Sequence, residues 1–396
     1  MTAVRRHPGG GLLRPRAPHA HARVSYVELF FDLVFVFAIT QLSHALLHDF
    51  TPMGVLRTAV LFLAVWWAWI NTAWVTNWVD PDRGPARLML FGLMLAGLVG
   101  SISIPGAFGA RGLAFAAAYG TLELSRSLFM LRAIGPGDAA LRRNFLRILC
   151  WQALAAPFWI AGALVEGGDG PRLALWLVAL AAWTVAPVLG FRVPGLGRST
   201  TADWTVEGGH LAERCALFII IALGESILVT GATFGTLGHT SSTIAAFLVA
   251  FVGSVAMWWV YFHIGVEQGS RRITASGDPG RLARLGYTYL HIPIVAGIVV
   301  AAVADERVLH HPEGHTSWGD AAVILGGPAL FLGGLSLFKR LGLGRLPLSH
   351  SLGLGLLLLL ALATPSLSPL ALSALAAAVL VFVAAWEHLS LGSRPA

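Results

Sequence analysis

Twelve long apolar stretches occupy almost the whole chain, and this pattern leaves little room for anything except helices that cross a membrane. Each has about the 20 apolar residues that a helix needs to cross the hydrocarbon core of a bilayer. With 56% hydrophobic and 12% charged residues and a mean hydropathy of +0.72, the chain does not have the composition of a soluble globular protein. The sequence therefore predicts an all-α, polytopic transmembrane helical bundle. We expect its spans at 24–48, 53–78, 86–105, 111–132, 145–165, 172–191, 208–232, 242–265, 282–304, 320–338, 349–364 and 368–388.

The basic residues predict an orientation for these spans. If residues 1–23 lie in the cytoplasm, 21 of the 27 Lys and Arg residues fall in loops or span ends on the cytoplasmic side. Only four, Arg57, Arg111, Arg172 and Arg307, fall on the opposite side. Because cytoplasmic loops are enriched in Lys and Arg, we expect both termini in the cytoplasm. The same reasoning explains the basic pI of about 10.2 without a nucleic-acid partner. Residues 1–23 are expected to form a disordered, Pro- and Gly-rich tail.

Four short texts occur twice in the same order, which indicates an internal duplication. VWWAWIN at 65–71 resembles MWWVYFH at 257–263, and ARL occurs at 86–88 and again at 283–285. The other matches are VELFFDLVFVFAI with AERCALFIIIALGE, and SLFMLR with SLFKR. We expect a six-span repeat over 24–199 and a second over 200–396. Since six is an even number, the repeats should be parallel, with spans one and seven at the interface where such proteins place functional sites.

Ionisable residues within these spans are the candidate functional groups. Each costs about 3 kcal/mol inside a bilayer even on the lenient insertion scale, so such residues normally pair in the interior of the bundle. Glu28 and Asp32 lie one helical turn apart in the first span, where their negative charges repel. His210 and Arg214 share one face of the seventh span, and we expect Arg214 to be a counter-ion for Glu28 or Asp32. The alternative is a buried salt bridge that only fixes helix packing.

Glu225 lies deeper in the seventh span, and no nearby residue in the sequence is basic. A protonatable carboxyl in a bundle core suits proton or cation coupling, and the alternative is a neutral Glu hydrogen-bonded to a neighbour. Asn71 and His263 occupy matching positions of the two tryptophan texts. We expect Glu123 and Arg126, three residues apart, to neutralise each other. We predict a polar cluster on one side of the membrane that comprises Glu28, Asp32, Asn71, His210, Glu213, Arg214, His263 and Glu267. Our candidate pathway or binding residues are Glu28, Asp32, Asn71, His210, Glu213, Arg214, Glu225 and His263.

The sequence contains no recognisable cofactor motif. The loop with His310, His311 and His315 and the two cysteines fit no standard zinc spacing, and no P-loop or dinucleotide-binding sequence is present. We expect the histidines to lie in a solvated external loop, and the alternative is a weak metal or pH-sensing site. We therefore expect no metal, no cofactor and no nucleotide-driven transport, and we assign no catalytic residue.

The texts SYVELFFDLVFVFAITQLSHAL, HLAERCALFIIIALGESIL and WWVYFHIG resemble the bacterial low-temperature-requirement A family. The resemblance covers the chain from Ser25 onward. It implies an integral protein of the bacterial cytoplasmic membrane, associated by name with growth at low temperature. It implies no particular substrate.

A weaker resemblance links residues 30–40 to the FSDxVFAIAIT opening helix of potassium channels built from two six-span repeats. It implies that the first helix of each repeat lines a pore and that Phe37 forms an apolar constriction there. This chain differs from those channels by Tyr26 in place of a basic residue and by a second repeat without the FSD text.

These observations favour a transporter or channel for a small cation or a proton-coupled solute, embedded in the lipid bilayer. Two alternatives stay open: a membrane-embedded acid–base enzyme, and a non-catalytic membrane scaffold of the cold response. The oligomeric state does not follow from the sequence.

Overall fold

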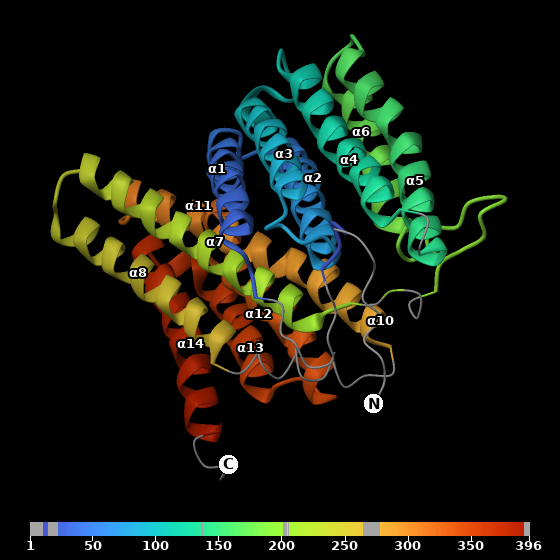
Figure 1. Cartoon of the computed structure of the whole chain (residues 1–396). Coiled ribbons are helices and arrows are strands. Elements are labelled where there is room, and N and C mark those ends of the chain that lie inside the picture. The colour runs from blue at the N-terminus through green and yellow to red at the C-terminus, as the bar shows by residue number, and fades with distance from the viewer. Residues whose placement is uncertain are drawn as a thin grey trace. The chain divides into compact units, whose positions relative to one another are not determined.

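The computed structural model describes residues 11–14, 23–135, 138–200, 204, 206–263 and 278–391, and their regular structure is helical (Figure 1). Within those residues, β-pairing is limited to two isolated bridges. Contacts divide the chain into two compact units. The first contains residues 1–45, 51–214 and 276–283, and the second contains residues 46–50, 215–275 and 284–396.

The first unit contains six long helices and the start of a seventh. Within it α3 packs on α4, α4 on α5 and α5 on α6, and α2 contacts both α4 and α6. Tryptophans fill much of its interior, and Trp66, Trp67 and Trp69 on α2 are each at most 1% exposed. The helices are α1 (Tyr26–His48), α2 (Pro52–Trp78), α3 (Gly84–Ser103), α4 (Gly112–Ile134), α5 (Ala139–Leu164), α6 (Asp169–Val185) and α7 (Gly208–Thr236), which continues into the second unit after Arg214.

The second unit is built on close packing of α11 against α12. A Cβ added at Gly297 of α11 would lie 2.5 Å from the backbone nitrogen of Phe331, so only glycine permits this approach. In the same unit α8 packs on α11 and α14, and α12 packs on α13 and α14. Its helices are α8 (Ser241–Phe262), α11 (His291–His310), α12 (Trp318–Leu343), α13 (Leu348–Ala363) and α14 (Pro369–Leu391), with a π-helical turn (Arg284–Tyr289) before α11. The short helix α10 (Pro279–Ala283) precedes that turn and belongs to the first unit.

Local sequence signals explain several helix boundaries. The Thr51 hydroxyl accepts a hydrogen bond from the Gly54 N–H at the start of α2, and Pro52 occupies the first helical position. Thr240 and Thr243 form a reciprocal capping box at the start of α8. Gly344 follows α12 with a φ of 75°, a left-handed conformation that glycine adopts without strain.

All twelve predicted spans overlap a helix of the described residues, which confirms the all-α prediction. Ten of these helices are long and apolar enough to cross a membrane. The other two are α6, which has 17 residues, and α4, which contains Glu123 and Arg126. The expected totals of twelve spans and two repeats therefore stay predictions.

Residues 11–14, part of the segment expected to be a disordered tail, contact the end of α2 in the first unit. Leu13 forms an isolated antiparallel bridge with Val79, and the Arg14 N–H donates to the Trp78 carbonyl at 2.8 Å. The backbone at the end of α2 thus offers hydrogen-bond partners to residues 11–14. Residues 1–10 and 15–22 lie outside the described residues.

Candidate functional site

Two buried pairs of side chains join α1 to the first turns of α7 in the first unit. The Glu28 Oε1 atom lies 2.8 Å from His210 Nε2, and Arg214 binds Asp32. Glu28 and Asp32 are one helical turn apart on α1, and His210 and Arg214 are one helical turn apart on α7. The two pairs are therefore neighbours along the contact between these helices, separated by one turn. All four residues are 0% exposed. The prediction that Arg214 lies against one of the two acids is confirmed, and the partner is Asp32.

The pair of Asp32 and Arg214 is a closed ion pair. Arg214 Nη1 and Nη2 donate to Asp32 Oδ2 and Oδ1 at 2.9 and 2.8 Å, the bidentate geometry that suits a guanidinium. The indole N–H of Trp69 donates to Oδ1 at 2.8 Å, and its ring lies 5.6 Å from the guanidinium carbon. Both carboxylate oxygens therefore have donors, whereas the buried Nε of Arg214 has none among the described residues.

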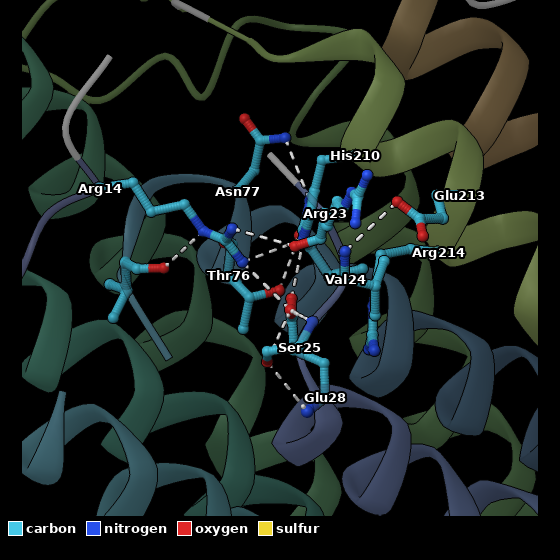
Figure 2. Close-up of polar contacts among 12 residues, drawn as sticks. Arg14, Arg23, Val24, Ser25, Glu28, Thr76, Asn77, His210, Glu213 and Arg214 are labelled. Carbon is cyan, nitrogen blue, oxygen red and sulfur yellow. Dashed lines mark hydrogen bonds and ion pairs between the residues drawn. The ribbon is translucent and has the colours of Figure 1, made fainter. Parts of the chain in front are cut away.

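Glu28 is held from three directions (Figure 2). Its Oε2 accepts from the backbone N–H of Ser25 at 2.8 Å and from Arg14 Nη2 at 3.1 Å. The Glu28 N–H in turn faces the Ser25 hydroxyl at 3.4 Å, so Ser25 and Glu28 form a capping box at the start of α1. Its other oxygen, Oε1, faces His210. Glu28 thus begins the helix and also contacts a titratable side chain.

His210 connects Glu28 to Asn77 of α2 (Figure 2). The Asn77 amide nitrogen lies 3.4 Å from His210 Nδ1 and donates to the Glu207 carbonyl at 2.8 Å. If His210 is neutral and its Nε2–H donates to Glu28, Nδ1 is free to accept from Asn77, so this tautomer fits the network. In that tautomer the contact of 3.3 Å from Arg14 Nη2 to Nε2 joins two donors and is not a hydrogen bond. The position of the proton between Glu28 and His210 therefore decides which contacts are hydrogen bonds.

Glu213 and Asn71 lie in the first unit but contact different groups. Glu213 Oε2 accepts from the Val24 N–H at 3.3 Å, just before α1 begins (Figure 2). Asn71 contacts Glu123 on α4 at 3.5 Å and belongs to a second buried polar cluster. In that cluster Arg126 pairs with Glu123 at 2.6 Å, as expected, and the Gln152 side chain donates to Glu123 at 3.1 Å.

The remaining candidates belong to the second unit. Glu225 is 7% exposed on α7. His263 is exposed and follows the last residue of α8, where its ring lies 5.9 Å from that of Trp259 and 5.0 Å from that of His388. Glu267 lies outside the described residues.

A buried cluster in the second unit was not expected from the sequence. Lys339 of α12 donates to both oxygens of Glu387 of α14 at 2.8 and 2.7 Å, and the Nδ1 atom of His350 on α13 lies 3.3 Å from Glu387. Lys339 directly follows the expected span 320–338, yet it is 4% exposed. The helix continues past the expected end of this span, and the pairing with Glu387 compensates the buried charge.

Arg14, Ser25 and Trp69 complete the first-unit site, although the sequence did not single them out as site residues. The text Ser25-x-x-Glu28 is a capping-box signal and could have linked Glu28 to Ser25. No sequence signal links Arg14 to Glu28, because the contact depends on the packing of the N-terminal segment against the end of α2.

The fold and this site define a multi-pass helical membrane protein that pairs ionisable side chains within its apolar helices. The chain belongs to the family described as Bacterial low temperature requirement A protein (LtrA), whose profile matches residues 23–385. It is also similar to a protein of Rhizobium meliloti (strain 1021) named Uncharacterized protein RA0937. The two are 42% identical over 371 residues, which cover 93% of this chain and 90% of that protein. No solved structure matches the chain.

Proposed function

We propose that this protein is a transporter or channel for a small cation or a proton-coupled solute, and that the paired ends of α1 and α7 form part of its pathway. The observation that carries the proposal is the buried contact of 2.8 Å between Glu28 and His210. Ionisable residues inside a membrane commonly mark ion pathways and proton relays. A carboxylate that contacts an imidazole can share one proton with it, and the proton can reside on either group.

The pair of Asp32 and Arg214 and the pair of Glu28 and His210 have different roles in this proposal. Arg214 keeps its charge, because a guanidinium stays protonated in proteins, and it binds both oxygens of Asp32. Glu28 and His210 can exchange a proton, and the guanidinium of Arg14 lies 3.1 Å from Glu28. Uptake of a proton by His210 would add a positive charge beside Arg14 and weaken the contacts of that arginine. A single proton can thus alter the contacts of the N-terminal segment.

We further propose twelve spans in two parallel repeats, over 24–199 and 200–396, in the bacterial cytoplasmic membrane with both termini cytoplasmic. Helix packing within each unit supports the duplication. In this comparison α2 corresponds to α8, α3 to α11, α4 to α12, α5 to α13 and α6 to α14. The contacts of α3 with α4, α4 with α5, α5 with α6 and α2 with α6 then all recur in the second unit. Termini on the same side of the membrane require an even number of spans, and the proposed twelve meet this requirement.

A membrane-embedded acid–base enzyme is the second candidate, and the same hydrogen bond between Glu28 and His210 favours it. Such a pair can transfer a proton to or from a bound substrate. The two candidates differ in a measurable way, because an enzyme needs no gradient and moves no ion. A non-catalytic scaffold of the cold response would need neither an ion gradient nor the contact between Glu28 and His210 for its function.

Flux measurements in proteoliposomes test the proposal. The purified protein is reconstituted, and gradients of potassium, sodium and protons are imposed in separate experiments. We expect flux in one of these gradients, reduced at least tenfold by Glu28→Gln and by His210→Gln. Asp32→Asn and Glu225→Gln test the remaining acids. Asp169→Asn is the matched control, because Asp169 pairs with Arg57 in the same unit and is partly exposed.

Two results would contradict the proposal. Wild-type protein without flux in any gradient would rule against transport of these ions and favour the enzyme or the scaffold. Flux that all four substitutions leave unchanged would support transport but place its pathway elsewhere in the protein.

A further inference from the structure

The second unit contains a small cavity whose wall is mostly apolar. Its volume is about 30 Å³, and residues of α8, α11, α12 and α14 line it. A cavity needs about 10–15 Å³ to hold one water molecule, so this one can hold one or two small occupants. A sodium ion is smaller than a water molecule and also fits. Alanines 301, 304, 376 and 377 form part of the wall, and such an apolar surround strengthens electrostatic attraction inside the cavity.

The polar side chains in this wall carry oxygen atoms that can coordinate a cation. Asp305 of α11, Ser254 of α8 and Ser373 of α14 all line the cavity. In the part of the chain that the structure describes, the Asp305 carboxylate has no hydrogen-bond or ion-pair partner, unlike Asp32, Glu28, Glu123 and Glu387. A carboxylate within a membrane helix needs compensation, because a lone charge there is costly.

The helix α12 carries a carbonyl without its usual donor beside this cavity. Pro328 lies inside α12 and lines the cavity together with Ile324. Proline has no N–H, so the Ile324 carbonyl lacks the donor that the residue four positions later normally provides in a helix. Freed helix carbonyls coordinate sodium ions or protons in membrane transporters. Oxygen-bearing side chains of three helices thus line the cavity, and Ile324 of the fourth helix lines it as well.

We propose that this cavity is a binding site for one monovalent cation of the size of sodium. Asp305 provides the compensating negative charge, and the Ser254 and Ser373 hydroxyls and the Ile324 carbonyl provide neutral oxygen ligands. One carboxylate matches a single positive charge. A divalent ion is disfavoured, because calcium takes six to eight oxygen ligands and magnesium keeps several waters, for which the cavity has no room. The inference concerns equilibrium binding and stands whether or not the protein transports.

Binding of radioactive sodium to the purified full-length protein in detergent tests this site. We expect saturable binding of one ion per chain, with affinity at least tenfold weaker in Asp305→Asn. Glu306→Gln is the matched control, since Glu306 is the next residue of α11 and does not line the cavity. It should bind as the wild type does. The melting temperature should rise by about 2 °C or more when sodium chloride replaces choline chloride, and this rise should vanish in Asp305→Asn.

A second variant keeps the charge but fills the space. Gly253 lines the cavity, and the nearest heavy atom to a Cβ added there is Ala377 Cβ at 4.0 Å. Gly253→Ala therefore introduces no clash, and we expect it to weaken sodium binding while the protein stays folded. Three results would overturn the proposal: no saturable sodium binding in the wild type, wild-type affinity in Asp305→Asn, or displacement of sodium by micromolar calcium. A carboxyl that only holds a proton and water would give the first result.

Discussion

The guanidinium of Arg214 holds both carboxylate oxygens of Asp32, at 2.9 and 2.8 Å, although 182 residues separate them in the sequence. Neither side chain has any exposed surface. Removing two charges from water is costly, and the pair offsets this cost only while both partners are present. This long-range contact fixes α1 against the first turns of α7.

Removing one partner of this pair should destabilise the protein strongly. We expect Arg214→Met to lower the free energy of unfolding by about 3–5 kcal/mol, because it leaves Asp32 charged, buried and bonded only to Trp69. The double variant Asp32→Asn with Arg214→Met should recover most of this loss, since it removes both charges and keeps an acceptor for Trp69. Thermal unfolding in detergent measures both. A double variant as unstable as the single one would mean that the pair does not fix the helices.

Arg14 should stabilise the first unit despite its place in the N-terminal segment. Its guanidinium donates to Glu28 at 3.1 Å and to the Thr76 carbonyl at 2.9 Å. Hydrogen bonds to charged groups contribute about 1.5–3 kcal/mol, so we expect Arg14→Gln to cost roughly 2 kcal/mol of unfolding free energy. Arg23→Gln is the control, because the Arg23 side chain is exposed and only its carbonyl contacts Arg14. Equal losses in the two variants would argue against the contact with Glu28.

The contact between α11 and α12 should tolerate no side chain at Gly297. A Cβ there would lie 2.5 Å from the Phe331 nitrogen and 2.7 Å from the Gly327 carbonyl oxygen, so the backbones must move apart. We expect Gly297→Ala to cost about 1–3 kcal/mol of unfolding free energy, as overpacking does in other cores. Gly326→Ala meets no atom within 4 Å and should be neutral or stabilising, since alanine favours the helix. The same effect for both would contradict the packing.

The proposed topology makes a prediction for two exposed loop residues. In a Cys150→Ser, Cys215→Ala background, His315→Cys should react with a membrane-impermeant maleimide in intact cells, because the loop between α11 and α12 is expected outside. Arg345→Cys, between α12 and α13, should react only after permeabilisation. The reverse labelling would invert the orientation, and equal labelling of both before permeabilisation would mean that α12 does not cross the membrane.

Helical periodicity predicted part of the site in the first unit. Residues four apart lie on one helix face, so Glu28 with Asp32 and His210 with Arg214 could be identified as two facing sets of polar groups. Glu123 and Arg126 were predictable for the same local reason. The sequence did not predict that Arg214 selects Asp32 and leaves Glu28 to His210. That choice depends on the axial position of α7 against α1, which no local pattern encodes.

For Asn71, in contrast, helical periodicity did not predict the contact that its side chain makes. Its position in the tryptophan text suggested a place beside Glu28 and Asp32, yet its amide faces Glu123 on α4. Trp69, two residues earlier and on another side of α2, is the residue that bonds Asp32. The rotation of α2 about its own axis decides which of these side chains meets α1, and a helix that is apolar on all sides gives little information about that rotation.

The sequence alone determined that this chain is a bundle of apolar helices, where most of these helices lie, and that Glu28, Asp32, His210 and Arg214 lie inside them. These features follow from local hydropathy and capping, because a bilayer forces each span to satisfy its own backbone hydrogen bonds. Only the tertiary structure decided the partners of the buried charges: Asp32 with Arg214, Glu28 with His210 and Arg14, and Lys339 with Glu387. These contacts join residues distant in sequence, and their geometry depends on how whole helices rotate and slide during packing.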